Sequence, residues 1–460
     1  MPHYNLNKHW IQFQSNGSFC YYPYSICREK AALLKLIGNW QAAEDIFRAN
    51  LEAALKSLDA RSIAQAKTDL SAICDTRGKE DEAFTLAQEA SWLWEKLNQT
   101  PGRVKAMGTM GNVYQHRSEY PKAMECYNAC LELSRRAGLD KDTCRMLNMV
   151  GLISYEMGDL EKALKFYGES LEIARRNNEP QYIAMASGNI GNVYLETGRW
   201  DQAMECYQRA LKESQRAGDK QAIAFGVGNI AIIYEKKGEY DKAMEWTRRQ
   251  YDTFTELGDQ VHLSVTLLNL GNIYLDTGRL DPAVESFTRQ IAISEGLKDK
   301  PILSYGNYML GIAHSEKGNF DEAQKALEQA IEVGRSIGFN HYVCGYLVRL
   351  AKLYLENGRP GQALALIPEA RKLAQEVKRP DVLLDLDVVS ARAAENKEMG
   401  KEQLKALLAA AAEEQKAEIL LQLWRLGAGE EYREQAAGQF KMLYEQTPKY
   451  QYQKSLAELT

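Results

Sequence analysis

The amino-acid sequence predicts an all-α solenoid of about eleven helical hairpins. Three observations support this prediction: a glycine recurs every 40 residues, an alanine follows it five residues later, and the intervening segments repeat an amphipathic helical pattern. The glycine positions are Gly38, Gly78, Gly158, Gly198, Gly238, Gly278, Gly318 and Gly358, with Ser118 at the remaining one. The alanine positions are Ala43, Ala83, Ala123, Ala163, Ala203, Ala243, Ala283, Ala323 and Ala363. A phosphate-binding loop would not recur nine times, so the glycines of the stretch GNIGNVYLETGR belong to a helical repeat.

Several of the first helices carry a glycine near the middle, as at Gly191, and usually a tyrosine three residues later, as at Tyr194. Glycine inside a helix costs about 1 kcal/mol relative to alanine, so its recurrence predicts that a second helix passes very close. The second helix is expected to supply the repeated alanine, and a large aromatic residue four positions later fills the space between hairpins. These aromatic residues are Phe47, Tyr127, Tyr167, Tyr207 and Phe287.

The turns carry residues suited to ending one helix and starting the next. Gly198 is predicted to end its first helix with a positive φ, and Asp201 is predicted to cap the second helix. Pro121 suits the first turn of a second helix, where a missing N–H costs little. The second helices are expected to stop at Gly138, Asn178, Gly218, Gly258 and Gly338.

The repeat pattern divides the chain into three regions. Nine 40-residue repeats occupy residues 24–377. Residues 1–23 fit no repeat, and this aromatic-rich extension either caps the first hairpin or docks on a partner. Residues 378–460 read as degenerate hairpins that form a C-terminal cap with polar outer faces. Pro368 is expected to kink its helix and to end the regular stacking.

Composition and short motifs exclude several classes of function. The 57 Lys and Arg residues against 62 Asp and Glu residues give a net charge of −5, which argues against nucleic-acid binding. No apolar run approaches the roughly 20 residues of a membrane helix, and the N-terminus lacks a signal-peptide pattern, so we expect a cytoplasmic protein without a membrane partner. The eight cysteines contain no CxxC and the six histidines no HExxH, so we expect no catalytic residue, metal or cofactor. The oligomeric state is left open.

The repeated pattern L/I-G-x-x-Y in the first helix and A-x-x-x-F/Y-x-x-A in the second resembles the tetratricopeptide repeat (TPR) over residues 24–377. The usual period of that family is 34 residues. The longer period found here is similar to that of Pins/LGN-type scaffolds, kinesin light chains and bacterial Rap-type regulators. The resemblance implies a right-handed superhelix whose first helices line a concave surface, and it implies that this surface binds a protein or peptide segment.

Inward positions of the first helices form a candidate peptide-binding groove. The resemblance implies that the asparagine after the helix glycine bonds the backbone of a bound peptide, because an amide both donates and accepts. Asn112, Asn192 and Asn272 match this position, whereas other copies carry leucine or isoleucine there. Alternatively, such asparagines bond between neighbouring helices, as we expect of Asn189. The candidate groove residues are Lys105, Asn112, Arg145, Asn148, Met185, Asn192, Phe225, Ile232, Val265, Leu268, Asn272, Tyr305, Tyr308 and Ile312.

The candidate groove is apolar and aromatic from Met185 to Tyr308, and exposed surface of that kind marks binding sites. One rim is acidic, with Glu156, Glu196, Asp276, Glu316 and Glu356. We therefore predict a non-enzymatic protein-interaction scaffold that takes a partner segment into the groove. The alternative is a regulatory or sensing subunit of a separate signalling enzyme. The sequence leaves open whether the groove or the convex face is used.

Overall fold

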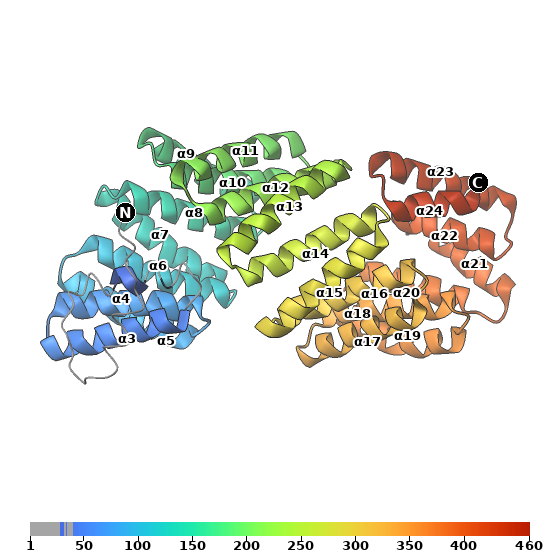
Figure 1. Ribbon diagram of the computed structural model, residues 1–460, viewed down its shortest axis with the longest axis horizontal. Coiled ribbons are helices and arrows are strands. Elements are labelled where there is room, and N and C mark those ends of the chain that lie inside the picture. The colour runs from blue at the N-terminus through green and yellow to red at the C-terminus, as the bar shows by residue number, and fades with distance from the viewer. Residues whose placement is uncertain (1–27, 32–33, 35–39) are drawn as a thin grey trace. The chain divides into compact units, whose positions relative to one another are not determined.

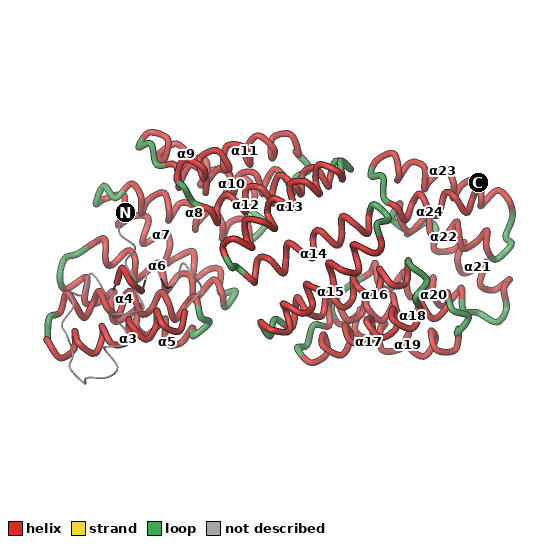
Figure 2. Tube along the Cα trace, viewed as in Figure 1, coloured by secondary structure: helices red, strands yellow, loops and turns green. Residues whose placement is uncertain are grey.

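The computed structural model describes residues 28–31, 34 and 40–460, and these residues form helices joined by short turns (Figure 1, Figure 2). No strand occurs in this part of the chain, which confirms the all-helical prediction for it. Within the same ranges, no helix is long and apolar enough to cross a membrane. The predictions for residues 1–23 and for Gly38 lie outside the described residues.

The chain divides into two compact units after Gly198. In the first unit each helix packs against the next, and α4 also contacts α6, α6 contacts α8, and α8 contacts α10. This pattern of neighbour and next-neighbour contacts is that of stacked helical hairpins. The helices of the first unit are α3 (Trp40–Ser57), α4 (Ala60–Thr76), α5 (Glu80–Lys96), α6 (Thr100–His116), α7 (Tyr120–Arg136), α8 (Asp140–Glu156), α9 (Leu160–Arg176) and α10 (Pro180–Glu196).

The second unit continues the sequential hairpins and then shortens them. Its full-length helices are α11 (Trp200–Ala217), α12 (Lys220–Lys236), α13 (Tyr240–Leu257), α14 (Gln260–Asp276), α15 (Leu280–Leu297), α16 (Lys300–Glu316), α17 (Phe320–Ser336), α18 (Asn340–Glu356) and α19 (Pro360–Glu376). Its last helices are α20 (Pro380–Arg392), α21 (Lys397–Leu407), α22 (Glu413–Arg425), α23 (Glu430–Gln446) and α24 (Tyr450–Leu459). Helix α24 returns to contact α14, so the end of the chain packs against the repeats of its own unit.

The helix glycines admit aromatic rings from the second helix of the same hairpin, which confirms the predicted close approach of that helix but not the prediction that these rings lie between neighbouring hairpins. A Cβ atom placed on Gly151 would lie 2.6 Å from Cε1 of Tyr167, and one on Gly271 would lie 2.4 Å from Cε1 of Phe287. Both rings are buried. The repeated alanines from Ala43 to Ala363 are completely buried, because the two helices of a hairpin meet there. Close packing therefore requires both small columns.

The turn glycines adopt the left-handed conformation, with φ between 66° and 81° from Gly78 to Gly358. Ser118, the exception in the column, takes the same conformation with φ of 57°. The second helices likewise end at left-handed residues, among them Gly218 and Asn178. The predicted turn geometry is thus confirmed, and the serine shows that the repeat imposes it even where glycine is missing.

The prediction that Asp201 caps a second helix is wrong. Helix α11 begins one residue earlier, and Arg199 occupies its N-cap position without a side-chain hydrogen bond. The Asp201 carboxylate instead pairs with Lys237 Nζ at 2.6 Å, while its place in the first turn still suits the helix dipole. Aspartates do cap several first helices: Asp259, for example, accepts a hydrogen bond from the backbone N–H of His262 at 3.1 Å.

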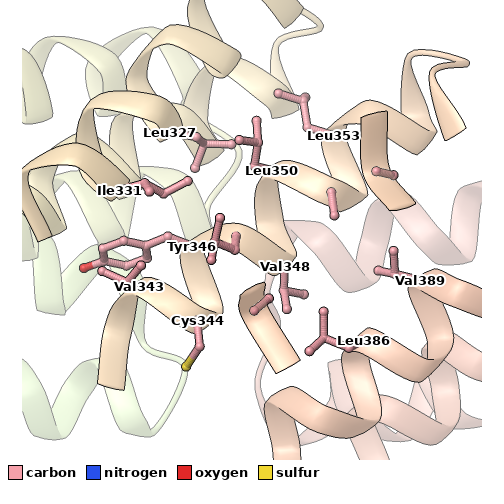
Figure 3. Close-up of a cluster of buried hydrophobic side chains, with 14 of the residues drawn as sticks. Leu327, Ile331, Val343, Cys344, Tyr346, Val348, Leu350, Leu353, Leu386 and Val389 are labelled. Atoms are coloured by element: carbon pink, nitrogen blue, oxygen red, sulfur yellow. The ribbon is translucent and has the colours of Figure 1, made fainter. Parts of the chain in front are cut away.

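Regular packing continues beyond Pro368, contrary to prediction. Helix α19 runs through this proline, which is exposed. Leu386 and Val389 of α20 join one hydrophobic core with side chains of α17 and α18 (Figure 3). The proline is tolerated because it faces solvent and removes only the one helical hydrogen bond that its missing N–H would donate. Shortened helices begin only at α20.

Candidate binding surface

The predicted groove residues of the first unit lie on α6, α8 and α10. Lys105 is exposed. Arg145 is half-buried and pairs with Asp142 Oδ1 at 2.8 Å. Met185 is also half-buried, and Asn192 is exposed. This face therefore offers a cation and a mixture of polar and apolar side chains.

Two asparagines of the candidate groove bond within the protein. Asn112 Nδ2 donates to Asp75 Oδ2 at 3.1 Å, and Asn112 Oδ1 accepts from the Tyr127 hydroxyl at 2.8 Å. Asn148 is completely buried, and its Nδ2 donates to Ser170 Oγ at 2.7 Å. Asn148 is therefore not a groove residue, because no face of it reaches solvent. Asn189 donates to Asn148 Oδ1 at 3.1 Å, so the alternative of bonding between helices describes these positions.

The second unit exposes an apolar face, which we define as Phe225 on α12 with Val261 and Val265 on α14. Their exposed fractions are 41%, 50% and 37%. The Phe225 ring makes edge contacts with His262, at a centroid distance of 4.8 Å, and with Phe254, at 5.6 Å. Because these contacts hold the ring while one side stays in solvent, Phe225 is a positioned apolar anchor.

The other predicted groove residues of the second unit are less accessible. Ile232, Asn272, Tyr305, Tyr308 and Ile312 are half-buried. Leu268 is buried in the hydrophobic core around α14, so its assignment to the groove is corrected. The first-helix pattern could not distinguish this core position from its exposed neighbours, because inward-facing and core-facing residues are adjacent around the helix.

A second feature of this unit is an acidic turn edge, which we define as Glu235, Asp276 and Glu316 together with the turn glycines Gly238 and Gly278. Burial raises the pKa of Glu235 and of Asp276. Lys449 lies close enough to oppose both shifts. A cavity of about 230 Å³ lies here, with Trp200, Glu235, Tyr240, Asp276, Lys449 and Tyr452 among its walls. Sequence reasoning placed Asp276 and Glu316 on an acidic rim but did not find what covers it.

Replacing Asp276 by asparagine is expected to stabilise the protein at neutral pH. The raised pKa means that the folded state holds the proton more tightly than the unfolded state, so the contribution of Asp276 to stability falls as the pH rises through that pKa. Asp276→Asn removes this penalty. We expect a higher Tm than wild type at pH 7.5 and a smaller difference as the pH approaches 4, measured by thermal unfolding. Asp281→Asn, at an exposed aspartate, is the control and should show no such trend.

In the first unit the carboxylates of Glu44 and Glu82 and the thiol of Cys74 lie close together, as the ligands of a metal ion do. Three cations already contact Glu44: Arg48 at 2.6 Å, Lys79 at 2.7 Å, and Arg77. Burial would raise the pKa of Glu44, but hydrogen bonds from Lys79 and Arg48 lower it to about 2. The cluster therefore works as an ion-pair network that joins α3 to the end of α4 and the start of α5.

Comparison with protein families shows which repeat this is. A tetratricopeptide repeat model matches residues 102–176, 142–212, 182–256, 220–296 and 262–336. Together these matches run from 102 to 336, just over half of the 460 residues. A model of anaphase-promoting complex subunit 5 matches residues 336–386. A comparison with curated protein sequences found no match.

Several solved structures align with this chain at low sequence identity. The apo form of the quorum sensor NprR from B. thuringiensis aligns with a TM-score of 0.52 and 16% identity, over 76% of this chain and 98% of that chain. A Rap protein complexed with competence and sporulation factor aligns with a TM-score of 0.48 and 14% identity, over 74% and 99%. Kinesin light chain repeats from P. anserina align with a TM-score of 0.37 and 16% identity, over 42% and 95%. The likeness to Pins/LGN-type scaffolds stays a prediction.

Proposed function

This chain belongs to the tetratricopeptide repeat family, and from that premise we propose that it acts by binding a segment of a partner protein rather than by catalysis. The observation that carries the proposal is the apolar face of the second unit. Exposed apolar surface of this kind on a folded protein is typical of an interaction site. The exposed Phe225 ring, held by its aromatic neighbours, is the expected anchor point.

The chemistry of the apolar face suggests what the partner segment carries. An apolar face built on two helices suits an amphipathic helix or an extended segment with one or two large apolar side chains. We therefore propose that the segment bound at the apolar face carries a large apolar anchor residue.

Truncation of the anchor is expected to weaken binding at least tenfold. Peptides selected on the wild-type chain from a displayed library supply the ligands, and calorimetry measures Kd. Phe225→Ser should reduce affinity at least tenfold and Val265→Ser by less, because a few large, well-packed side chains at the centre of an interface contribute most of the binding energy. Leu364→Ser, at an exposed leucine of α19, is the matched control and should leave Kd unchanged.

The opposite pattern would overturn the proposal. If the selected peptides bind the Phe225→Ser variant as tightly as wild type, the apolar face is not the binding site. Circular dichroism of each variant verifies that the helices are intact. Loss of binding in Leu364→Ser but not in Phe225→Ser would move the site to another face of the unit.

A second candidate function is regulation of a separate signalling enzyme. It is favoured by the structural likeness to the apo quorum sensor NprR, which extends over 76% of this chain. On this reading the bound segment is a short signalling peptide or a domain of the regulated enzyme. The two candidates differ in outcome: only a regulator changes the activity of an added partner enzyme when the selected peptide is present.

A further inference from the structure

The segment 447–454, which we call the strap, crosses the ends of three successive first helices in the second unit. A Cβ atom on Gly238 would lie 2.5 Å from Cδ of Pro448, and one on Gly278 would lie 2.5 Å from Cδ2 of Tyr450. Lys454 Nζ donates to Glu316 Oε2 at 2.8 Å. One strap residue therefore contacts the end of each of α12, α14 and α16.

These contacts distinguish two turns from the others of the same unit. Gly318 and Gly358 have the same left-handed conformation as Gly238 and Gly278, but nothing lies within 4 Å of a Cβ placed on them. The repeat accounts for the positive φ in all four turns. At Gly238 and Gly278 the absence of a side chain also makes room for the strap, because Pro448 and Tyr450 lie where a Cβ atom would be.

Charge complementarity accompanies the close packing. The strap carries Lys449 and Lys454, and the edge beneath it carries Glu235, Asp276 and Glu316. Lys449 lines the cavity above the first two acids, and Lys454 pairs with the third. The edge therefore matches a segment with two cations and a tyrosine between them.

The strap is held weakly by the acidic turn edge and firmly by the core of the last helices. The Lys454–Glu316 pair is partly exposed, and such pairs contribute at most about 1 kcal/mol. The cavity leaves part of the interface unfilled. By contrast, Tyr452 within the strap is buried with Phe440 and Leu459 in the core of the last helices. Pro448, Tyr450 and Lys454 can therefore separate from the edge while Tyr452 stays in that core.

We propose that the acidic turn edge is a binding site for a basic, tyrosine-containing segment, and that residues 447–454 occupy it in cis as a displaceable strap. The site lies at the ends of the helices and is distinct from the apolar face, so it does not depend on the function proposed above. The test can therefore fail while the apolar face still binds peptides, and the reverse also holds.

The first test opens the strap and supplies its sequence in trans. The variant Tyr450→Ala/Lys454→Glu removes the ring from Gly278 and places a negative charge against Glu316. We expect hydrogen exchange of residues 447–454 to become at least tenfold faster. A fluorescent peptide of wild-type sequence 445–456 should bind this variant at least tenfold more tightly than wild type, because only the variant has an open site. A scrambled peptide is the control.

A charge exchange then locates the site. The charge exchange uses a second opened variant, Tyr450→Ala/Lys454→Ala, which leaves no charge in cis to pair with position 316. Adding Glu316→Lys to this variant should abolish binding of the wild-type peptide and permit binding of a peptide that carries glutamate in place of Lys454. If the peptide does not bind the opened variant, or if Glu316→Lys leaves its binding unchanged, the proposal is wrong. Unchanged exchange of the strap in the opened variant would equally contradict it.

A matched pair of glycine variants separates strap displacement from backbone strain. Gly278→Ala and Gly318→Ala introduce the same unfavourable left-handed alanine, with φ of 70° and 79°. Only the methyl group at position 278 collides with Tyr450. We expect at least tenfold faster exchange of residues 447–454 in Gly278→Ala and wild-type exchange there in Gly318→Ala. Equal exchange in the two variants would overturn the proposal.

Discussion

Replacing Glu44 by glutamine is expected to destabilise the first unit by about 3 kcal/mol at neutral pH, because its lowered pKa means that the folded state stabilises the charged carboxylate. The Glu44 side chain is only 1% exposed and is held by Arg48, Arg77 and Lys79. Glutamine keeps the shape but not the charge. Urea unfolding followed by circular dichroism measures the difference.

A control on the same helix isolates burial as the cause. Glu52 pairs with Lys56 at 2.6 Å across one helical turn, but both side chains are largely exposed. Glu52→Gln should leave the urea midpoint almost unchanged, because exposed pairs of this spacing contribute little. Equal effects of Glu44→Gln and Glu52→Gln would show that the ion-pair network contributes no more than a surface contact.

The pH dependence of the Glu44 effect follows from the direction of its pKa shift. The pKa is lowered from 4.5 to about 2 in the folded state, so unfolding takes up a proton between these values. The stabilisation by Glu44 is fully present above pH 4.5 and is lost as the pH falls toward 2. We therefore expect the gap between wild type and Glu44→Gln to be constant from pH 6 to 8 and smaller at pH 3.

Replacing Gly151 by alanine is expected to destabilise the first unit by about 2 kcal/mol, because overpacking a filled core typically costs 1–3 kcal/mol. The added methyl group would lie 2.6 Å from the Tyr167 ring, which is buried and cannot withdraw. The gain in helix propensity when alanine replaces a helix glycine is smaller than this cost of overpacking. Urea unfolding again measures the change.

Gly188 is the matched position for this experiment. It lies in α10, and no atom lies within 4 Å of a Cβ placed on it. Gly188→Ala is therefore expected to stabilise by about 0.5–1 kcal/mol through helix propensity alone. Opposite signs for the two glycines would establish the aromatic contact as the reason for the glycine at position 151, whereas destabilisation by both would argue for a general need for backbone freedom.

Much of the fold could be predicted from the sequence because its signals are local and repeated. The helix glycine at position 151 predicts a closely packed second helix, whereas its contact with the Tyr167 ring of the same hairpin is seen only in the structure. The left-handed turn at Ser118 follows from the same register. Asp201 shows the limit of this reasoning: a shift of two positions separates a helix cap from a first-turn residue, and the spacing pattern does not resolve it.

The candidate surface was less predictable because exposure depends on neighbours. Phe225 and Leu268 both belong to predicted groove columns, yet one is an exposed anchor and the other is buried in the core. Asn148 matches the other groove positions in spacing but is enclosed by Ser170 and Asn189. Helix periodicity predicts which residues share one face of a helix. The packing of the adjacent helix decides how much of each side chain on that face is exposed to solvent.

The pairing of helices into hairpins follows from the amino-acid sequence alone, because the 40-residue alternation of small and large side chains acts between residues that are close along the chain. The cover of the acidic turn edge by the strap depends instead on contacts between distant parts of the chain. The pair of Lys454 with Glu316 joins residues 138 positions apart. No repeated spacing records such a contact, since it depends on how the last helices return to the repeats and not on the pattern within any one of them.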